Sequence, residues 1–150
     1  MTILVSACLL GVACRFDGAS LPCAQVLSLM EKHTLIPVCP EILGGLPTPR
    51  PAAEIQGSAV CTKEGRDVSA AYQRGAKEAL RLARLYGAEA AILKARSPSC
   101  GVGKVYDGRF SGTLIQGNGI TAALLQQNGI PVFTEKDVEN GILPNGKQAD

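Results

Sequence analysis

Apolar residues form four short runs along the chain, and each run predicts a buried β-strand. The runs cover residues 3–7, 34–38, 90–95 and 130–133. Between them, apolar positions recur at helical spacing over about residues 22–33, 70–86 and 120–128. Strands that alternate with helices are typical of an α/β fold with a parallel sheet.

Proline indicates where each strand lies in that sheet. Pro37 falls inside the second strand and Pro131 in the fourth, and proline is tolerated mainly at sheet edges. The first and third strands contain no proline and read as buried apolar runs. Because crossover connections are right-handed, the strand order 2-1-3-4 is favoured. The prediction is a three-layer α/β fold, Rossmann-like or flavodoxin-like, with a parallel sheet.

The connecting segments are rich in glycine and proline. Residues 40–50 and 97–119 are expected to be loops, and Asn118 is expected to cap the last helix. The tail, about residues 141–150, is expected to be frayed.

An inserted hairpin is expected over about residues 55–68. In this interpretation, residues 58–61 pair with residues 66–68 across a turn at Glu64-Gly65.

Composition narrows the class of protein. The 150 residues are 46% hydrophobic and 19% charged, which predicts one globular domain over residues 1–150. Fifteen basic residues against thirteen acidic ones, with no basic block, argue against binding to nucleic acid or to a membrane surface through charge. No apolar run has the length of a membrane span. We therefore expect a cytoplasmic protein, in which cysteines more often bind metal or catalyse than form disulfides.

Three of the six cysteines lie where a predicted strand gives way to a loop, namely Cys8, Cys39 and Cys100. The carboxyl ends of parallel strands meet at one edge of a sheet, so we expect these thiolates to converge there. Three thiolates are one fewer than a closed tetrahedral metal site needs. The pattern indicates a reactive cofactor with one position left open.

The other cysteines have different contexts. Cys23 and Cys61 are expected to be packing residues, on the inner face of a helix and in the hairpin. Cys14 and Asp17 follow the first strand closely enough to line the same cleft. The chain has no C-x-x-C pair, which counts against a zinc finger or a thioredoxin-type redox couple.

Glu41 stands two residues beyond Cys39. Beside a metal, a carboxylate at this place is a candidate general base, whereas alone it would be interpreted as a solvated loop residue.

The segment around Cys100 superficially resembles a phosphate-binding loop. The Walker pattern fails there, because Pro98 replaces its first glycine and Val105 replaces its Ser/Thr. A tight loop that presents Cys100 with the hydroxyls of Ser97 and Ser99 describes it better.

Several motifs occur in order along the chain: SACLLG at residues 6–11, CRFDG at 14–18, PVCPE at 37–41, GGLPTPR at 44–50, ILKARSPSCG at 92–101 and YDGRFSG at 106–112. In these motifs the chain resembles, from about Ile3 to Glu135, the small bacterial domain family that includes thiouracil desulfidase.

The resemblance implies an enzyme that removes sulfur from a thiolated pyrimidine by hydrolysis, without net electron transfer. It implies a [4Fe-4S] cluster held by Cys8, Cys39 and Cys100, with the substrate sulfur on the open iron. The catalytic glutamate of the family would fall on Glu41, and its catalytic serine on Ser97 or Ser99, of which we prefer Ser97.

Two other functions remain as hypotheses. An iron–sulfur protein for electron transfer or redox sensing would use Cys14 as a fourth ligand. A binding module would carry zinc or nothing at the thiolates, and the missing C-x-x-C pairs disfavour zinc. If Glu41 is not the base, Glu54 and Asp17 are the next candidates.

Overall fold

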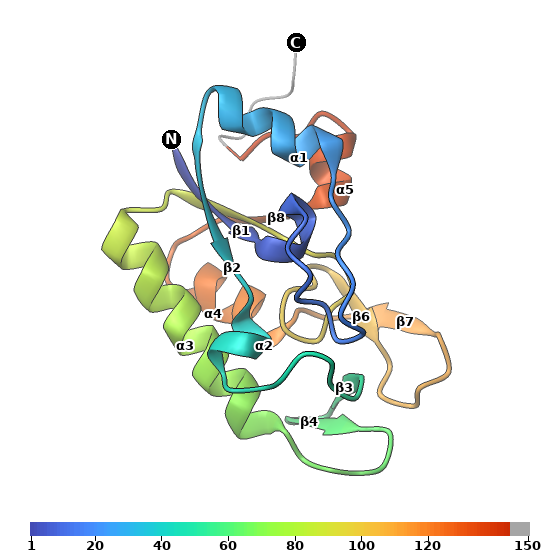
Figure 1. The fold of residues 1–150 in the computed structure, drawn as a ribbon. Helices are drawn as coiled ribbons and strands as arrows, with labels where there is room; N and C mark the ends of the chain where they lie inside the picture. The colour runs from blue at the N-terminus through green and yellow to red at the C-terminus, as the bar shows by residue number, and fades with distance from the viewer. Residues whose placement is uncertain (145–150) are drawn as a thin grey trace.

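The computed structural model describes residues 1–144, and a parallel four-stranded sheet lies at its centre (Figure 1). The strands are β1 (Thr2–Ser6), β2 (Thr34–Val38), β5 (Ala90–Leu93) and β8 (Val132–Thr134). Their order is β2-β1-β5-β8, and every pair is parallel. The predicted order 2-1-3-4 is therefore confirmed.

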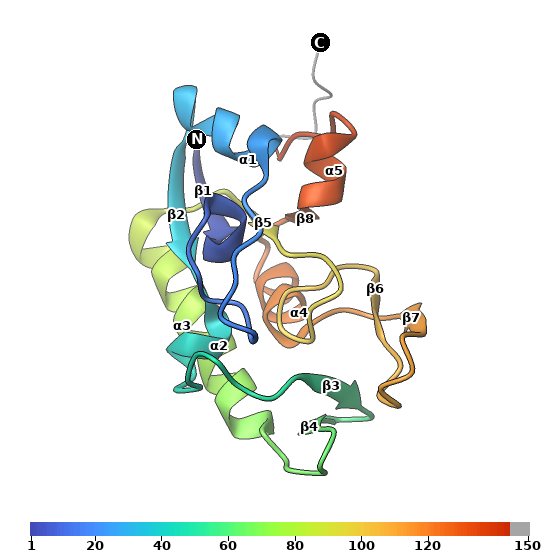
Figure 2. The same ribbon diagram turned by 45° about the vertical axis from the view of Figure 1, so that its right-hand side comes forward.

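Helices cover both faces of this sheet, as Figures 1 and 2 show. Successive side chains of a strand point to opposite faces, so β1 contributes Ile3 and Val5 to one core and Leu4 to the other. The first core includes residues from α1 (Ala24–Ser28) and α5 (Glu135–Glu139). The second includes residues from α3 (Ser69–Tyr86) and α4 (Ile120–Gln127). The three-layer α/β prediction is confirmed.

The two prolines lie at the edges of the sheet, as predicted. Pro37 lies in β2, one edge of the sheet, and Pro131 immediately precedes β8, the other edge.

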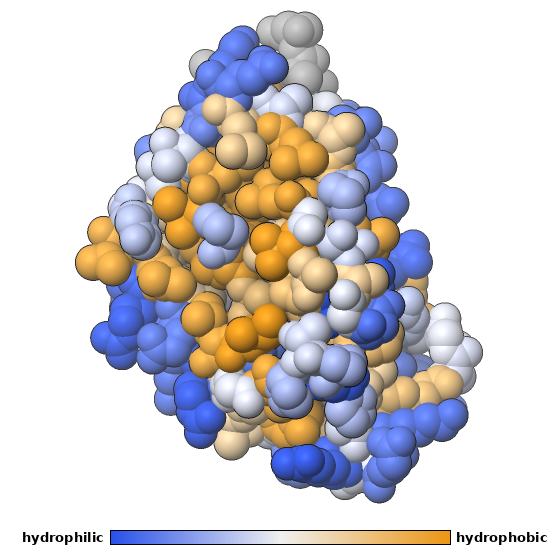
Figure 3. Space-filling view, viewed as in Figure 1, coloured by the Kyte–Doolittle hydropathy of each residue, from blue (hydrophilic) through white to orange (hydrophobic). Residues whose placement is uncertain are grey.

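Figure 3 shows apolar surface across the middle of the face on which β2 is seen in Figure 1. Large apolar side chains exposed in the molecule include Val12, Ile42 and Leu43.

The inserted hairpin exists, but its pairing differs from the prediction. Strand β3 (Ala53–Gln56) pairs with β4 (Ala59–Thr62), whereas residues 66–68 contribute an isolated bridge between Cys61 and Asp67. The physical reason is the two-residue connection at Gly57-Ser58, where Gly57 adopts a φ of 62°. A glycine in this region allows a tight hairpin that most other residues would strain.

Both predicted loops contain short regular elements. Residues 40–50 begin with α2 (Pro40–Leu43), because proline is suited to the first turn of a helix. Residues 97–119 contain an antiparallel hairpin of β6 (Lys104–Tyr106) and β7 (Leu114–Gln116). Asn118 does not cap α4, whose N-cap is Gly119. The Asn118 side chain instead accepts a hydrogen bond from the Gly103 amide at 2.8 Å.

The first predicted helix is shorter than expected. The helix predicted over residues 22–33 is α1 followed by the 3-10 turn η2 (Leu29–Glu31). Near the carboxyl end of the chain, the amides of Gly141 and Ile142 donate hydrogen bonds to the carbonyls of Val138 and Asp137 in α5. Residues 145–150 of the expected tail lie outside the described residues. Within residues 1–144, no helix combines the length and apolar character that a membrane crossing requires.

Candidate active site

A cavity of about 420 Å³ lies at the carboxyl edge of the sheet, and Cys8, Cys39 and Cys100 all line it. Cys8 sits in the 3-10 turn η1 (Ala7–Leu10) directly after β1. Cys39 stands between β2 and α2, and Cys100 follows β5 in the next loop. The structure thus brings together three thiols that are up to 92 positions apart in the sequence, as the strand-end argument predicts.

Ser6, the last residue of β1, connects two of these segments. Its hydroxyl oxygen accepts a hydrogen bond from the Lys94 amide at 2.9 Å, and the hydroxyl donates to Sγ of Cys100 at 3.6 Å. The thiol of Cys39 donates to the carbonyl of Cys14 at 3.6 Å. The strand ends and their loops therefore determine where the three sulfur atoms lie.

Burial favours the neutral thiol form of Cys8 and Cys100. Burial raises the pKa of Cys8 to about 11, with the neighbouring Cys39 adding to the effect. Burial likewise raises the pKa of Cys100 to about 12. Iron is bound by thiolates, so loading a metal group here has to displace a proton from each buried thiol.

The donor set fits a thiolate-ligated cluster with an open position. In the described part of the chain, no three His, Cys, Asp or Glu side chains are grouped as ligands of one metal ion. A cubane cluster makes a different demand, because each thiolate binds its own iron at a separate corner. Three thiols that line one cavity meet that demand.

The remaining cysteines divide as the sequence indicates. Cys14 lines the cavity and is buried. Burial raises the pKa of its thiol to about 12, and the nearby Cys39 thiol adds to this. Cys23 and Cys61 do not line this cavity; Cys23 is buried at the start of α1, and Cys61 lies in β4 opposite Glu54.

Asp17, which was expected to line the cleft, also lies outside the cavity lining. Its carboxylate accepts a hydrogen bond from the Ala19 amide at 3.0 Å within a turn.

Glu41 lies in α2 and lines the cavity, and a close approach of two helices positions it. A Cβ on Gly75 of α3 would collide with the Pro40 carbonyl, and a Cβ on Gly44 would collide with the Ala71 carbonyl. Two glycines therefore let α2 lie directly on α3. This contact brings Glu41 of α2 to Tyr72 of α3.

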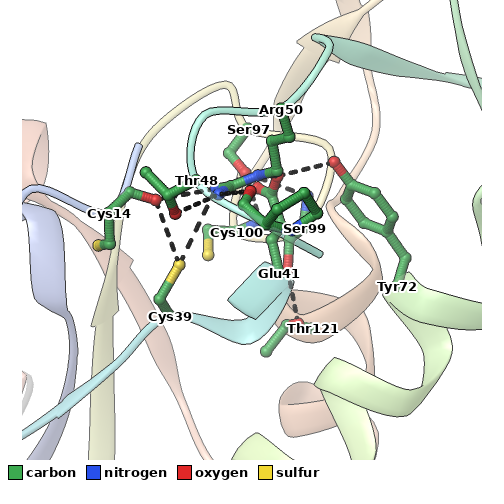
Figure 4. Close-up of polar contacts among 11 residues, drawn as sticks. Cys14, Cys39, Glu41, Thr48, Arg50, Tyr72, Ser97, Ser99, Cys100 and Thr121 are labelled. Carbon is green, nitrogen blue, oxygen red and sulfur yellow. Dashed lines mark hydrogen bonds and ion pairs between the residues drawn. The ribbon is translucent and has the colours of Figure 1, made fainter. Parts of the chain in front are cut away.

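Arg50 and Tyr72 meet the Glu41 carboxylate, as Figure 4 shows. Neither residue is among the functional residues predicted from the sequence. Burial alone would lower the pKa of Arg50, but the Glu41 carboxylate, together with Cys39 and Tyr72, outweighs burial and the pKa is raised. Burial, with the adjacent carboxylate, raises the pKa of the Tyr72 phenol. Arg50 ends the GGLPTPR motif, and that position was the signal available in the sequence.

The two serines of the Cys100 loop have different surroundings. Ser97 lines the cavity, and its Oγ accepts hydrogen bonds from the amides of Ser99 and Cys100, each at 3.1 Å. Within residues 1–144, its own O–H makes no hydrogen bond and remains available to donate. Ser99 is only 1% exposed and shares a 2.7 Å hydrogen bond with Thr121 of α4, away from the cavity lining.

Glu54 also lines the cavity, but its carboxylate has a structural task. It accepts hydrogen bonds from the amides of Gly108 at 3.0 Å and Phe110 at 3.2 Å. Phe110 has a φ of 55°, a left-handed conformation unusual for a residue other than glycine. Glu54 therefore holds the turn between β6 and β7.

Comparison with known proteins identifies the family of this chain. The family model for 2-thiouracil desulfurase matches residues 3–137. An uncharacterized protein of Bacillus subtilis strain 168, YbbK, is 42% identical and aligns with 94% of this chain and 99% of its own. The solved structure of the [4Fe-4S]-dependent thiouracil desulfidase TudS is 47% identical, with a TM-score of 0.87 over 93% of each chain. The chain therefore belongs to the 2-thiouracil desulfurase family.

Proposed function

We propose that this protein removes sulfur by hydrolysis from a thiolated pyrimidine such as thiouracil, using a [4Fe-4S] cluster held by Cys8, Cys39 and Cys100. One observation carries the proposal: a single cavity contains these three thiols together with the carboxylate of Glu41. The family match and the likeness to TudS support both the substrate class and the cofactor.

The reaction exchanges a thiocarbonyl for a carbonyl. One water adds its oxygen to the ring carbon, the carbon–sulfur bond breaks, and sulfur leaves as hydrosulfide with a proton, so no net electron transfer is needed. When bound, the cluster would supply an iron with an open position, a soft Lewis acid suited to thiocarbonyl sulfur.

Two side chains are proposed to assist this reaction. Glu41 would accept a proton from the attacking water, since its carboxylate lines the cavity that would hold the substrate, and this proton would leave with the sulfur. Ser97 would donate a hydrogen bond through its O–H to the ring as charge develops, because both hydrogen bonds that its oxygen makes among residues 1–144 are accepted ones. Ser99 is the less suitable serine, since its hydroxyl is paired with Thr121.

A second candidate function rests on Cys14. This thiol lines the same cavity as the three proposed ligands, so an electron-transfer protein with four cysteine ligands is the alternative. The two proposals differ in one requirement: an electron carrier needs Cys14 to retain its cluster, whereas the hydrolase does not.

Anaerobic purification with iron and sulfide counts, followed by mixing with thiouracil, tests the proposal. The expected result is about four irons and four sulfides per chain and formation of uracil without added reductant. A fully loaded protein that forms no uracil would contradict the hydrolase. A reversible redox couple that disappears in Cys14→Ala would favour the electron carrier.

A further inference from the structure

Arg50 is almost fully enclosed, with 3% of its side chain exposed. All its nitrogens are occupied. Nε donates to Oε1 of Glu41 at 3.0 Å, and Nη1 donates to the Pro47 carbonyl and the Thr48 hydroxyl. Nη2 donates to the Cys14 carbonyl at 2.9 Å and approaches Sγ of Cys39 at 4.0 Å. One planar guanidinium thus connects the proposed base with a proposed cluster ligand.

The Glu41 carboxylate is held at only one of its two oxygens. Oε1 accepts hydrogen bonds from Nε of Arg50 at 3.0 Å and from the hydroxyl of Tyr72 at 2.9 Å (Figure 4). Among residues 1–144, no side chain or amide donates to Oε2. Because Glu41 lines the cavity and its side chain is 16% exposed, the second oxygen remains available to a ligand there.

We propose that Arg50 and Tyr72 are positioning residues: together they hold Oε1 of Glu41, so that Oε2 is the oxygen that accepts the proton. This inference rests on the proposed function. The two donors come from different parts of the fold, the end of the loop after α2 and the first turns of α3. Oε1 is therefore held from two directions, which restricts rotation of the carboxylate more than one bond would.

The residue types suit this task. A guanidinium presents several donors in a fixed plane, whereas a lysine ammonium is a point charge on a flexible stem. Only the planar fork can reach Oε1, the Cys14 carbonyl and the Cys39 sulfur at the same time. A base fixed near its proton avoids the entropic cost of ordering it in the transition state. Arg50 thus sets the position of the base relative to Cys39.

A double-mutant cycle between Tyr72→Phe and Glu41→Gln tests the inference. Phenylalanine keeps the ring of this buried side chain and removes only the donor. In the otherwise unchanged protein, Tyr72→Phe should lower kcat about 10- to 100-fold with little change in KM, the cost of one hydrogen bond to a charged group. In the Glu41→Gln background, it should lower kcat no further. Tyr86→Phe, on the exposed end of α3, is the matched control.

Arg50→Lys is the second variant, with Arg81→Lys on the surface of α3 as its control. Iron content and the absorbance change on adding thiouracil should stay at the parental level in Tyr72→Phe. Arg50→Lys should lower kcat at least as much as Tyr72→Phe per loaded cluster, and crystal structures of both variants should show Glu41 in more than one side-chain conformation.

Three results would overturn the inference: an unchanged kcat, an equal loss of kcat with and without Glu41, or a single unchanged Glu41 conformation in both variants. If the parental protein forms no uracil, the proposed function fails by that result alone. The order of the Glu41 side chain then still decides whether Arg50 and Tyr72 hold the carboxylate.

Discussion

Glu41→Gln separates the basicity of this side chain from its shape. The glutamine oxygen can take the place of Oε1 and accept the same hydrogen bonds from Arg50 and Tyr72. The buried Arg50 loses its counter-charge but also keeps its three other oxygen acceptors, so unfolding should become easier by about 1–3 kcal/mol. A domain of this size is usually stable by about 5–15 kcal/mol, so the variant should fold.

The rate of Glu41→Gln should fall by much more than its lower free energy of unfolding could explain. A general base contributes about 100- to 10,000-fold, which corresponds to about 2.7–5.4 kcal/mol of activation free energy. Initial rates of uracil formation from thiouracil, measured anaerobically with iron content as the reference, give this ratio. Glu64→Gln, on the exposed turn after β4, is the matched control. A parental rate in Glu41→Gln would refute Glu41 as the base and direct attention to Glu54.

Three further predictions concern other parts of the site. Ser97→Ala should keep the cluster and lose about 100-fold or more in rate, whereas Ser99→Ala should keep most of the rate and lower the unfolding free energy by about 1 kcal/mol. Rate measurements and thermal unfolding of both variants check this, and a larger loss of rate in Ser99→Ala would identify Ser99 as the catalytic serine. Cys8→Ala, Cys39→Ala and Cys100→Ala should each lose the intact cluster, while Cys14→Ala, Cys23→Ala and Cys61→Ala should retain it by iron counts and absorbance; loss in Cys14→Ala would contradict the open position. Gly75→Ala should push α2 away from α3 and reduce both Tm and kcat, because the added Cβ meets the Pro40 carbonyl; parental values of both would show that the close approach is not needed.

The positions of the cysteines could be predicted because they depend on periodicity and topology alone. Apolar runs mark the strands, proline marks the edges, and parallel strands direct their carboxyl ends to one side. Cys8, Cys39 and Cys100 therefore had to lie at one edge once the order of strands was correct. Glu41 followed from its short distance to Cys39 along the chain.

The support around Glu41 could not be predicted in this way. Tyr72 lies on the apolar face of α3 and has the helical spacing of a core residue. Its hydroxyl meets Glu41 only because Gly44 and Gly75 allow two helices to touch, and such a contact leaves no local periodicity. Arg50 likewise gains its role from atoms up to 36 positions away in the sequence.

Short elements were missed for a related reason. The helix α2 has a single turn between Pro40 and Gly44, so it contains no full helical period to recognise. The hairpin of β6 and β7 lies among glycines that read as loop. Its partner contacts, including Glu54 to Gly108, join segments 54 positions apart.

Turnover of thiouracil in oxygen-18 water, with the loaded protein under anaerobic conditions and no reductant, tests the hydrolytic desulfurase most directly. The predicted products are uracil with one oxygen-18 atom in place of the former sulfur and one hydrosulfide for each uracil formed. Uracil without the label, a requirement for reductant, or loaded protein that releases no hydrosulfide would contradict it.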